Sequence, residues 1–342
     1  TNNSEEFAVN VIGRDGFFCI PIFQRQYTWN KPRIDQFFSD IKEILDEDTP
    51  HFLGAIILAE RPTSPSEPNH YDVIDGQQRL MSIFLLICAA IKILANRGQE
   101  KSAATYYEKF IVLSQPGKSG SNIRLQPGLN DRSQLNDIVE SLAENKNLKP
   151  CLKTELALLS APSNGKKKGK IKGAFKEFEK SLIQLVPDPK GDISIVQMML
   201  DTALSSLSVV QIVVTDPTNA PKIFDSLNGG QAPLTIGELV KNGIFSKAAK
   251  ESADKLTQLD QHTWQPFYEK FEAAGPTAFD RYFFPFGLAK DPNVKKSETY
   301  RTLSQLWSDI KDPIMVIRDL TRYQHTFLAV KYDIAGLEVE KS

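Results

Sequence analysis

The chain has 342 residues, with 41 Lys or Arg against 42 Asp or Glu, so its formal net charge is −1. Hydrophobic residues make up 41% and charged residues 24%, which is ordinary for globular proteins and excludes the disordered and fibrous classes. The length suggests two structural units, or one core with a large appendage. Because the whole chain is no polycation, any contact with nucleic acid requires a local basic patch.

The cysteines and the hydropathy pattern indicate the compartment. Cys19, Cys88 and Cys151 are odd in number and form no C-x-x-C pair, which is typical of a reduced cytoplasmic protein. No apolar run reaches the roughly 18 uninterrupted residues of a membrane span. The N-terminus "TNNSEEFAVN" has no signal-peptide pattern, and its lack of an initiator Met indicates a fragment.

The first predicted elements alternate between strands and a helix. Asn30 followed by Pro32 is a helix-start signal, and apolar residues then recur at helical spacing. The Pro- and Ser-rich segment 61–70 is a loop between two strands. The predicted elements before residue 76 are a strand at 16–22, a helix at 31–47, and strands at 51–60 and 71–75.

From Gly76 the apolar spacing predicts a helix that is hydrophobic on a wide face and central to the core. Beyond residue 98 the chain is mostly helical, except that 207–215 is β-branched and predicts a strand returning to the first sheet. The basic, glycine-rich segment 160–173 is predicted to be an exposed loop. The fold class is therefore α+β, with a mixed sheet and helices followed by a mostly α-helical region.

The junction "VIDGQQRL" carries the strongest chemical signal. If a strand ends at Ile74, Asp75 stands at the helix start, and the first amides of the helix can bind an anion. Because Asp75 alone would repel a phosphate, a Mg²⁺ ion shared by Asp75 and a triphosphate resolves the conflict. The alternative is a purely structural role, in which Asp75 caps the helix and Arg79 forms a surface ion pair.

A second cluster, "IPIFQRQYTW", follows the first strand. Its amide, basic and aromatic side chains suit binding to phosphate and stacking on bases. In the alternative, Tyr27 and Trp29 staple the next helix to the sheet. A third cluster at 223–245 comprises a helix, a polar glycine turn and a second helix started by Thr235, and it is equally a tight helix connection.

Other signals fail on spacing. "GKKKGK" has three rather than four residues between its glycines, and "QPGKS" lacks the first glycine, so neither is a P-loop. The four histidines form no H-x-E, H-N-H or E-x-x-H pairing, so the chain itself is not expected to nick DNA.

These clusters, in this order, resemble the N-terminal domain of the GmrSD-type modification-dependent restriction proteins, including those of phosphorothioate-based phage defence. The pattern I-P-x-x-Q-R-x-Y-x-W, F-L-G, D-G-Q-Q-R-L and F-x-x-L-N-x-x-G-x-x-L is matched at Ile20, Pro21, Gln24, Arg25, Tyr27, Trp29, Phe52, Leu53, Gly54, Asp75 to Leu80, Phe224, Leu227, Asn228 and Leu234. One departure is Asn228-Gly229-Gly230-Gln231, which lacks the family's usual basic residue after Asn.

The resemblance implies a ParB and sulfiredoxin-like core over residues 1–245, with a helical insertion at about 98–205 and a helical region at 246–342. It implies hydrolysis of a nucleoside triphosphate, with GTP expected, coupled to sensing of modified DNA. Mg²⁺ would accompany the nucleotide. The family's C-terminal HNH nuclease domain has no counterpart here, and a homo-oligomer is compatible with the resemblance.

Roles are assigned on this basis. Catalysis is expected at Asp75, Arg79 and Gln78, and Asp75 is expected to hold Mg²⁺. Nucleotide binding is expected at Gly76, Gln77, Gln78, Arg79, Gln24 and Arg25. DNA sensing is expected at Tyr27, Trp29 and Arg25. The alternative is a nucleotide-gated DNA-binding adaptor of ParB type with little or no turnover. A weaker third hypothesis is a toxin-like or regulatory protein with a vestigial pocket.

Overall fold

The computed structural model describes residues 2–21, 24, 26–47, 49–61, 63, 67–115, 117, 119–158, 170–188, 190–214, 235–248, 258–275, 277–310 and 312–333. The chain divides into two compact units, Thr1–Gly230 and Gln231–Ser342. The domain boundary predicted at residue 245 falls inside helix α9 (Ile236–Ala248). In the structure the whole of α9 belongs to the second unit.

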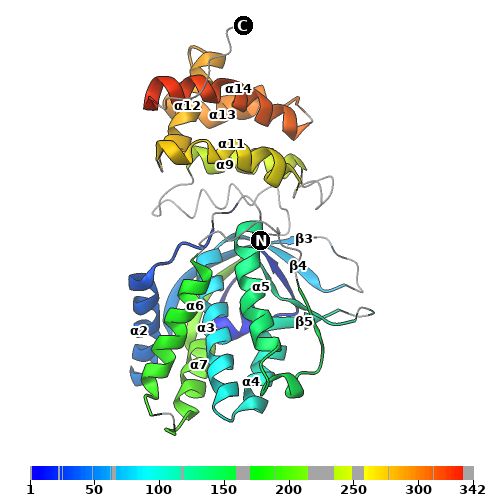
Figure 1. Ribbon diagram of the computed structural model, residues 1–342, viewed down its shortest axis with the longest axis vertical. Helices are drawn as coiled ribbons and strands as arrows, with labels where there is room; N and C mark the ends of the chain where they lie inside the picture. The colour runs from blue at the N-terminus through cyan, green and yellow to red at the C-terminus, as the bar shows by residue number, and fades with distance from the viewer. Residues whose placement is uncertain are drawn as a thin grey trace. The chain divides into compact units, whose positions relative to one another are not determined.

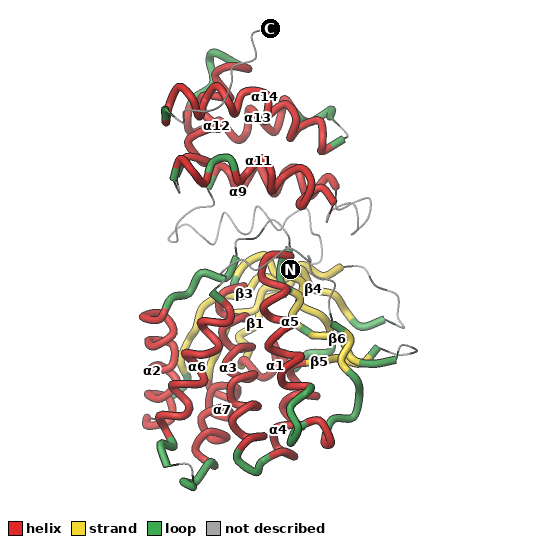
Figure 2. The backbone as a smooth tube through the Cα atoms, in the orientation of Figure 1, coloured by secondary structure: helices red, strands yellow, loops and turns green. Residues whose placement is uncertain are grey.

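The first unit is built on a six-stranded mixed sheet with the strand order β1-β9-β3-β4-β2-β7 (Figures 1 and 2). β2 is parallel to β4 and to β7, whereas β3 is antiparallel to β4 and parallel to β9. The strands are β1 (Asn2–Phe7), β2 (Gly16–Cys19), β3 (His51–Arg61), β4 (Asn69–Asp75), β7 (Leu125–Gln126) and β9 (Leu207–Val214). The predicted α+β class and the return of the 207–215 strand to the first sheet are both confirmed.

Some strands carry no sequence signal. β1 reads Asn-Asn-Ser-Glu-Glu-Phe, which is polar, and it is a strand because it pairs antiparallel with β9 at the edge of the sheet. A second sheet, with the order β5-β6-β8, lies in the region predicted as helical. Its strands are β5 (Val112–Ser114), β6 (Ser121–Ile123) and β8 (Leu156–Ala157), which are too short for an alternating pattern to show.

Helices cover one face of the large sheet (Figure 1). α3 packs against α4, α5, α6 and α7, and α2 packs against α6 and α7. The predicted helix 31–47 is confirmed as α2, whose start is capped by Asn30, since Asn30 Oδ1 accepts from Arg33 N. The helices are α1 (Ala8–Ile12), α2 (Lys31–Glu47), α3 (Gln77–Asn96), α4 (Glu100–Tyr106), the π-helix η1 (Tyr107–Ile111), α5 (Leu129–Ala143), the 3₁₀-helix η2 (Lys149–Cys151), α6 (Ile171–Leu185) and α7 (Ser194–Ser206).

α3 is the central helix of the core, as predicted. By length and composition it is apolar enough to cross a membrane, but 89% of its apolar window is buried inside the protein. Its one lysine, Lys92, is held by Glu179 of α6 at 2.6 Å and lies over the Phe175 ring. These contacts are those of a core helix.

The predicted loop 160–173 is too long at its C-terminal end, because α6 begins at Ile171. Ile171 and Ala174 are buried at helical spacing, and this packing outweighs the local glycine and lysine content. Most of the rest of the segment, including Lys166, Lys167 and Lys168, lies outside the described residues.

The second unit is helical and has an aromatic core, in which the Trp264 ring packs on Phe245, Phe267 and Phe279. Thr235 starts α9, as predicted, through a capping box: Thr235 Oγ1 accepts from Glu238 N, and Glu238 Oε2 accepts from Thr235 N. The other helices are the π-helix η4 (Asp260–Trp264), α11 (Gln265–Glu269), the 3₁₀-helices η5 (Glu272–Ala274) and η6 (Lys296–Glu298), α12 (Ala278–Lys290), α13 (Thr299–Leu306) and α14 (Pro313–Tyr332).

Candidate functional site

The junction between β4 and α3 is formed by a single left-handed glycine. β4 ends at Asp75, and Gly76 has φ 88° before α3 begins at Gln77. A Cβ at residue 76 would lie 2.8 Å from Ile56 Cγ1 and 3.0 Å from the carbonyl oxygen of Ala55, so a larger residue does not fit without movement. The glycine therefore lets the helix N-terminus lie directly against β3.

The helix cap is not the predicted one. Gly76 occupies the N-cap position without a side-chain hydrogen bond, and its carbonyl accepts from Leu80 N at 2.9 Å. The prediction that Asp75 caps α3 is therefore wrong, because Asp75 is still part of the strand. The first amides of a helix have no partner within it, so those of Gln77, Gln78 and Arg79 remain available to an anion.

Arg79 is not the surface residue that the sequence suggested, because its side chain is only 13% exposed. One terminal nitrogen, Nη1, donates to the carbonyl of Ala55 and lies 3.6 Å from Asp75 Oδ2. A Cβ at residue 54 would lie 3.0 Å from Arg79 Nε, so Gly54 makes room for the guanidinium on β3. F-L-G and D-G-Q-Q-R thus form one packed unit.

The amide side chains join this junction to the segment after β2. Gln24 Nε2 donates to the carbonyl of Ile74 at 2.8 Å. Gln78 accepts from Thr28 N at 2.8 Å through Oε1 and donates to the carbonyl of Gln26 at 3.1 Å through Nε2. Both ends of the Gln78 side chain are therefore used within the chain, so the side chain positions the segment after β2, and any phosphate contact of Gln78 falls to its backbone amide.

The structure brings most of the predicted site residues together. Gln24, Asp75, Gly76 and Arg79 lie at one junction, and Gln77 is buried beside them. Arg25 and the predicted turn at 228–231 lie outside the described residues. Sequence reasoning missed the functions of Gly54 and of the Ala55 carbonyl, although Gly54 was visible in the F-L-G motif.

Tyr27 is a core residue, so the prediction that it offers an exposed DNA-sensing ring is wrong. It is 4% exposed, and its hydroxyl lies 2.8 Å from Ser82 Oγ on α3. Trp29 packs edge-on against Phe37 of α2, with ring centroids 5.6 Å apart. Trp29 therefore packs on the next helix, as the alternative expects, whereas Tyr27 contacts α3 through Ser82 and lies 6.4 Å from Trp29 between ring centroids.

Tyr27→Phe should lower the free energy of unfolding by about 1 kcal/mol, the typical contribution of one buried hydrogen bond. The loss should stay this small because Ser82 Oγ also donates to the carbonyl of Gln78 at 2.8 Å and keeps that partner. Urea unfolding of both proteins measures the difference. A loss as large as that expected for Tyr27→Ala, about 3–5 kcal/mol, would show that the ring packing itself depends on the hydroxyl.

Trp29 is only partly buried. The Arg33 guanidinium lies 5.3 Å from the Trp29 ring centroid, which places a cation on a half-buried aromatic surface. Lys170 Nζ donates to the carbonyl of Thr28 at 3.1 Å beside it. An apolar ring next to cationic groups therefore exists in this region, although Tyr27 does not contribute to it.

Asp131, at the start of α5, holds the same segment from the other side. It is 7% exposed, its Oδ2 accepts from Tyr27 N at 2.7 Å, and its Oδ1 has no partner among the described residues. Burial raises the pKa of this carboxyl to about 6, and the hydrogen bond from Tyr27 N opposes the shift. A buried carboxylate oxygen without a hydrogen-bond partner lowers the stability of the folded state when the group is ionised.

Asp131→Asn should therefore change stability with pH. The folded pKa lies above the ordinary value of 3.8, so ionisation costs the folded wild type stability as the pH rises from about 4 through 6. The stability of the variant relative to the wild type should increase over that window and level off above it, with a total change on the order of 2–3 kcal/mol. Urea unfolding at a series of pH values tests this, and a difference independent of pH would contradict it.

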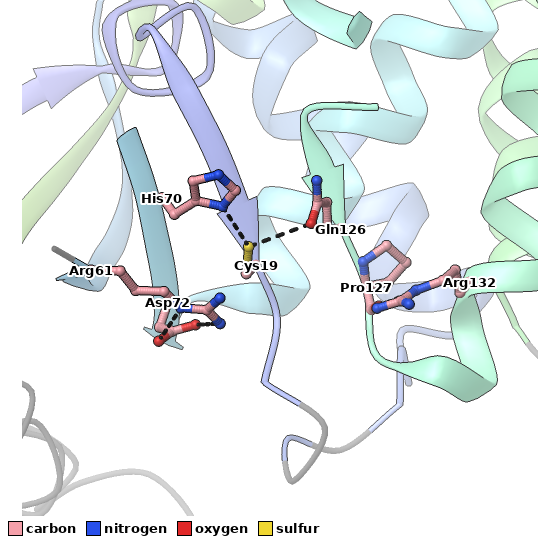
Figure 3. Close-up of polar contacts among 7 residues, drawn as sticks. All are labelled: Cys19, Arg61, His70, Asp72, Gln126, Pro127 and Arg132. Carbon is pink, nitrogen blue, oxygen red and sulfur yellow. Dashed lines mark hydrogen bonds and ion pairs between the residues drawn. The ribbon is translucent and has the colours of Figure 1, made fainter. Parts of the chain in front are cut away.

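Another group of polar side chains lies around Cys19 of β2 (Figure 3). Cys19 Sγ lies 3.8 Å from His70 Nδ1 and 3.6 Å from Gln126 Oε1, and beside it Arg61 Nε donates to Asp72 Oδ2 at 2.9 Å. Burial raises the pKa of the Cys19 thiol to about 11, so the thiol is protonated at neutral pH.

No group of three or more His, Cys, Asp and Glu side chains that could hold a metal ion occurs within the described ranges. The prediction that the chain does not nick DNA remains a prediction.

The first unit is therefore an α+β domain with a mixed sheet, helices on one face, and a candidate anion site at the glycine-formed junction that holds Asp75 and Arg79. Residues 7–245 match the family described as "GmrSD restriction endonuclease, N-terminal domain". The chain belongs to this family, so it is part of a DNA restriction system. No curated protein sequence matches the chain.

Proposed function

We propose that the first unit is a nucleoside triphosphatase, with GTP as the expected substrate, that couples hydrolysis to the recognition of modified DNA. The observation that carries the proposal is the β4–α3 junction, where the N-terminus of α3 has no side-chain cap and lies beside Asp75 and Arg79. Helix N-termini of this kind bind phosphates in many nucleotide-binding proteins. The same proposal places the protein in the cytoplasm, where nucleotide and DNA are both present.

The donor set fits a magnesium–triphosphate complex. Mg²⁺ in nucleotide sites is held by one or two carboxylates, with water and phosphate oxygens as the other ligands. Asp75 is a single carboxylate, 22% exposed, at the end of the strand that leads into the helix. When bound, the ion would neutralise phosphate charge that Asp75 alone would repel.

The residues of the chain then divide the work. The backbone N–H groups of Gln77, Gln78 and Arg79 bind phosphate oxygens. The Gln24 side chain fixes the end of β4 through the carbonyl of Ile74. Arg79 holds the carboxylate of Asp75 in place and adds positive charge from the β3 side. Asp75 acts in hydrolysis in one of two ways: it holds Mg²⁺ as described above, or it orients the attacking water and accepts its proton.

DNA recognition is assigned to the surface around Trp29, with Arg33 as its cationic group. A phosphorothioate carries a larger and more weakly hydrated sulfur in place of an oxygen, so it suits an aromatic ring beside a cation. Cleavage of DNA is assigned to a C-terminal nuclease domain in the full-length protein.

One observation favours the alternative of a nucleotide-gated adaptor with little turnover. Asp75 already has Arg79 at 3.6 Å, and a carboxylate neutralised in this way binds a cation less strongly. Tight nucleotide binding with slow or absent turnover is the result that this alternative predicts.

The test is nucleotide turnover by the purified chain with each triphosphate and Mg²⁺, alone and with plain, phosphorothioated or hydroxymethylated duplex. Turnover of one triphosphate that rises with one modified duplex is expected. Binding without turnover supports the adaptor, and the absence of any nucleotide binding contradicts both.

A further inference from the structure

Two hollows flank the helical segment α4–η1, which follows the C-terminal end of α3 and packs against it. One, of about 560 Å³, is lined by Lys101, Ala104, Thr105, Glu108, Lys109, Cys151 and Lys153. The other, of about 370 Å³, shares Thr105 and Lys109 with it. η1 is a π-helix, a form often found at functional sites. Because α3 has 20 residues, its two ends are roughly 30 Å apart.

The larger hollow is positively charged. Lys101, Lys109 and Lys153 are exposed, and among the described residues no carboxylate lies within 4.0 Å of their ammonium groups. Elsewhere in the first unit Lys92 and Lys172 are ion-paired, at Glu179 and Asp137 respectively.

Two acids that line these hollows accept hydrogen bonds within the chain. Glu108 Oε1 accepts from Lys153 N at 2.8 Å, so it fixes the backbone that carries one of the three lysines. In the smaller hollow, Asp201 accepts from the hydroxyl of Tyr106. The three lysines outnumber Glu108, the one acid among the described residues that line the larger hollow, so the hollow keeps a net positive charge that can meet an anion. Lys109 Nζ also lies 5.1 Å from the Phe110 ring centroid.

We propose that the larger hollow binds the sugar–phosphate backbone of duplex DNA, independently of sequence and modification. It rests on the proposed function only in taking DNA as the partner. Lys101 and Lys109 are eight residues apart, roughly 12 Å along a helix, so they meet phosphates at separate points. Because the net charge of the chain is −1, nucleic-acid binding needs such a local cluster.

The charge test compares two triple variants with the same change in net charge. Lys101→Gln/Lys109→Gln/Lys153→Gln neutralises the hollow. Lys42→Gln/Lys176→Gln/Lys180→Gln is the control, because these three lysines are exposed on α2 and α6, away from the hollow.

The hollow variant should bind plain and phosphorothioated duplex on the order of 10- to 100-fold more weakly than the wild type, and the slope of log K against log salt should shrink by about 2–3. The control should keep the affinity and the slope, and both variants should keep basal nucleotide turnover. Equal losses in both variants would assign the effect to overall charge and overturn the proposal.

Cys151 gives a second readout within the same protein. Cys19 and Cys88 are buried, whereas Cys151 is half-buried and lines the hollow, so an alkylating reagent should modify it first. Saturating plain duplex should slow this alkylation severalfold in the wild type and in the control. Mass spectrometry of the modified peptide identifies the site.

An alkylation rate unchanged by bound duplex would overturn the proposal, and so would protection by free triphosphate without protection by DNA. If the wild-type chain binds no duplex at all, the DNA-sensing part of the proposed function fails as well. If it binds duplex normally and the hollow variant does too, only the present inference fails.

Discussion

Gly76→Ala should be among the most damaging single substitutions in the first unit. Gly76 has φ 88°, and an added Cβ would lie 2.8 Å from Ile56 Cγ1. Left-handed backbone costs a residue other than glycine about 1–2 kcal/mol, and the overpacking adds about 1–3 kcal/mol. The start of α3 would shift away from β3, so we expect a stability loss of that combined size together with loss of nucleotide binding.

Gly98→Ala is the matched control, because Gly98 follows the same helix at its other end. Its φ is 83°, but nothing lies within 4 Å of the position of its Cβ. Gly98→Ala should lose only the stability that the left-handed backbone costs, and it should keep full nucleotide binding. Thermal unfolding and fluorescent-nucleotide titration measure both effects, and equal behaviour of the two variants would mean that contact with β3 is unimportant.

Arg79→Ala should be nearly as harmful, since it removes a mostly buried guanidinium and leaves Asp75 and the Ala55 carbonyl without their partner. Loss of such charged hydrogen bonds costs about 2–3 kcal/mol. The surface ion pair expected in the alternative is therefore a mostly buried one. Nucleotide binding should fall together with stability.

Arg79→Lys separates the two effects, because it keeps the charge but not the planar group that lies against Gly54. We expect intermediate stability and weakened nucleotide binding. Arg61→Ala is the control: Arg61 also pairs with an aspartate of β4 but is 48% exposed, and its loss should cost less than about 1 kcal/mol. Unchanged nucleotide affinity in a folded Arg79→Lys protein, at a temperature where both are native, would remove Arg79 from the site.

The helices and strands with strong periodic patterns were predictable from the sequence. α2 has both a start signal and apolar residues at helical spacing, and five of the eight residues of β9 are Val or Ile. β1 was not predictable, because its polar sequence becomes a strand only through pairing with β9. The short strands of the second sheet likewise depend on their partners and show no pattern of their own.

The site was predictable in part, for a similar reason. The spacing of Asp75, Gly76 and Arg79 indicated a strand-to-helix junction, and the structure places them in one. The sequence does not show whether a side chain is buried, and the burial of Tyr27 depends on Ser82 and Asp131, distant residues that only the fold brings to it. An aromatic residue beside Gln and Arg therefore suggested an exposed stacking surface where the fold has a core contact.

The central claim is that Asp75 acts in hydrolysis at the β4–α3 junction. Its most direct test is nucleotide affinity and single-turnover hydrolysis for Asp75→Asn, beside Asp72→Asn as the control. Asp72 lies on the same strand but pairs with Arg61.

Asp75→Asn should keep nucleotide affinity within a few-fold while hydrolysis falls on the order of 10²- to 10⁴-fold, the usual contribution of a general base, and Asp72→Asn should leave both unchanged. Parallel loss of affinity, turnover and thermal stability in Asp75→Asn would instead make Asp75 a structural partner of Arg79 and contradict the claim.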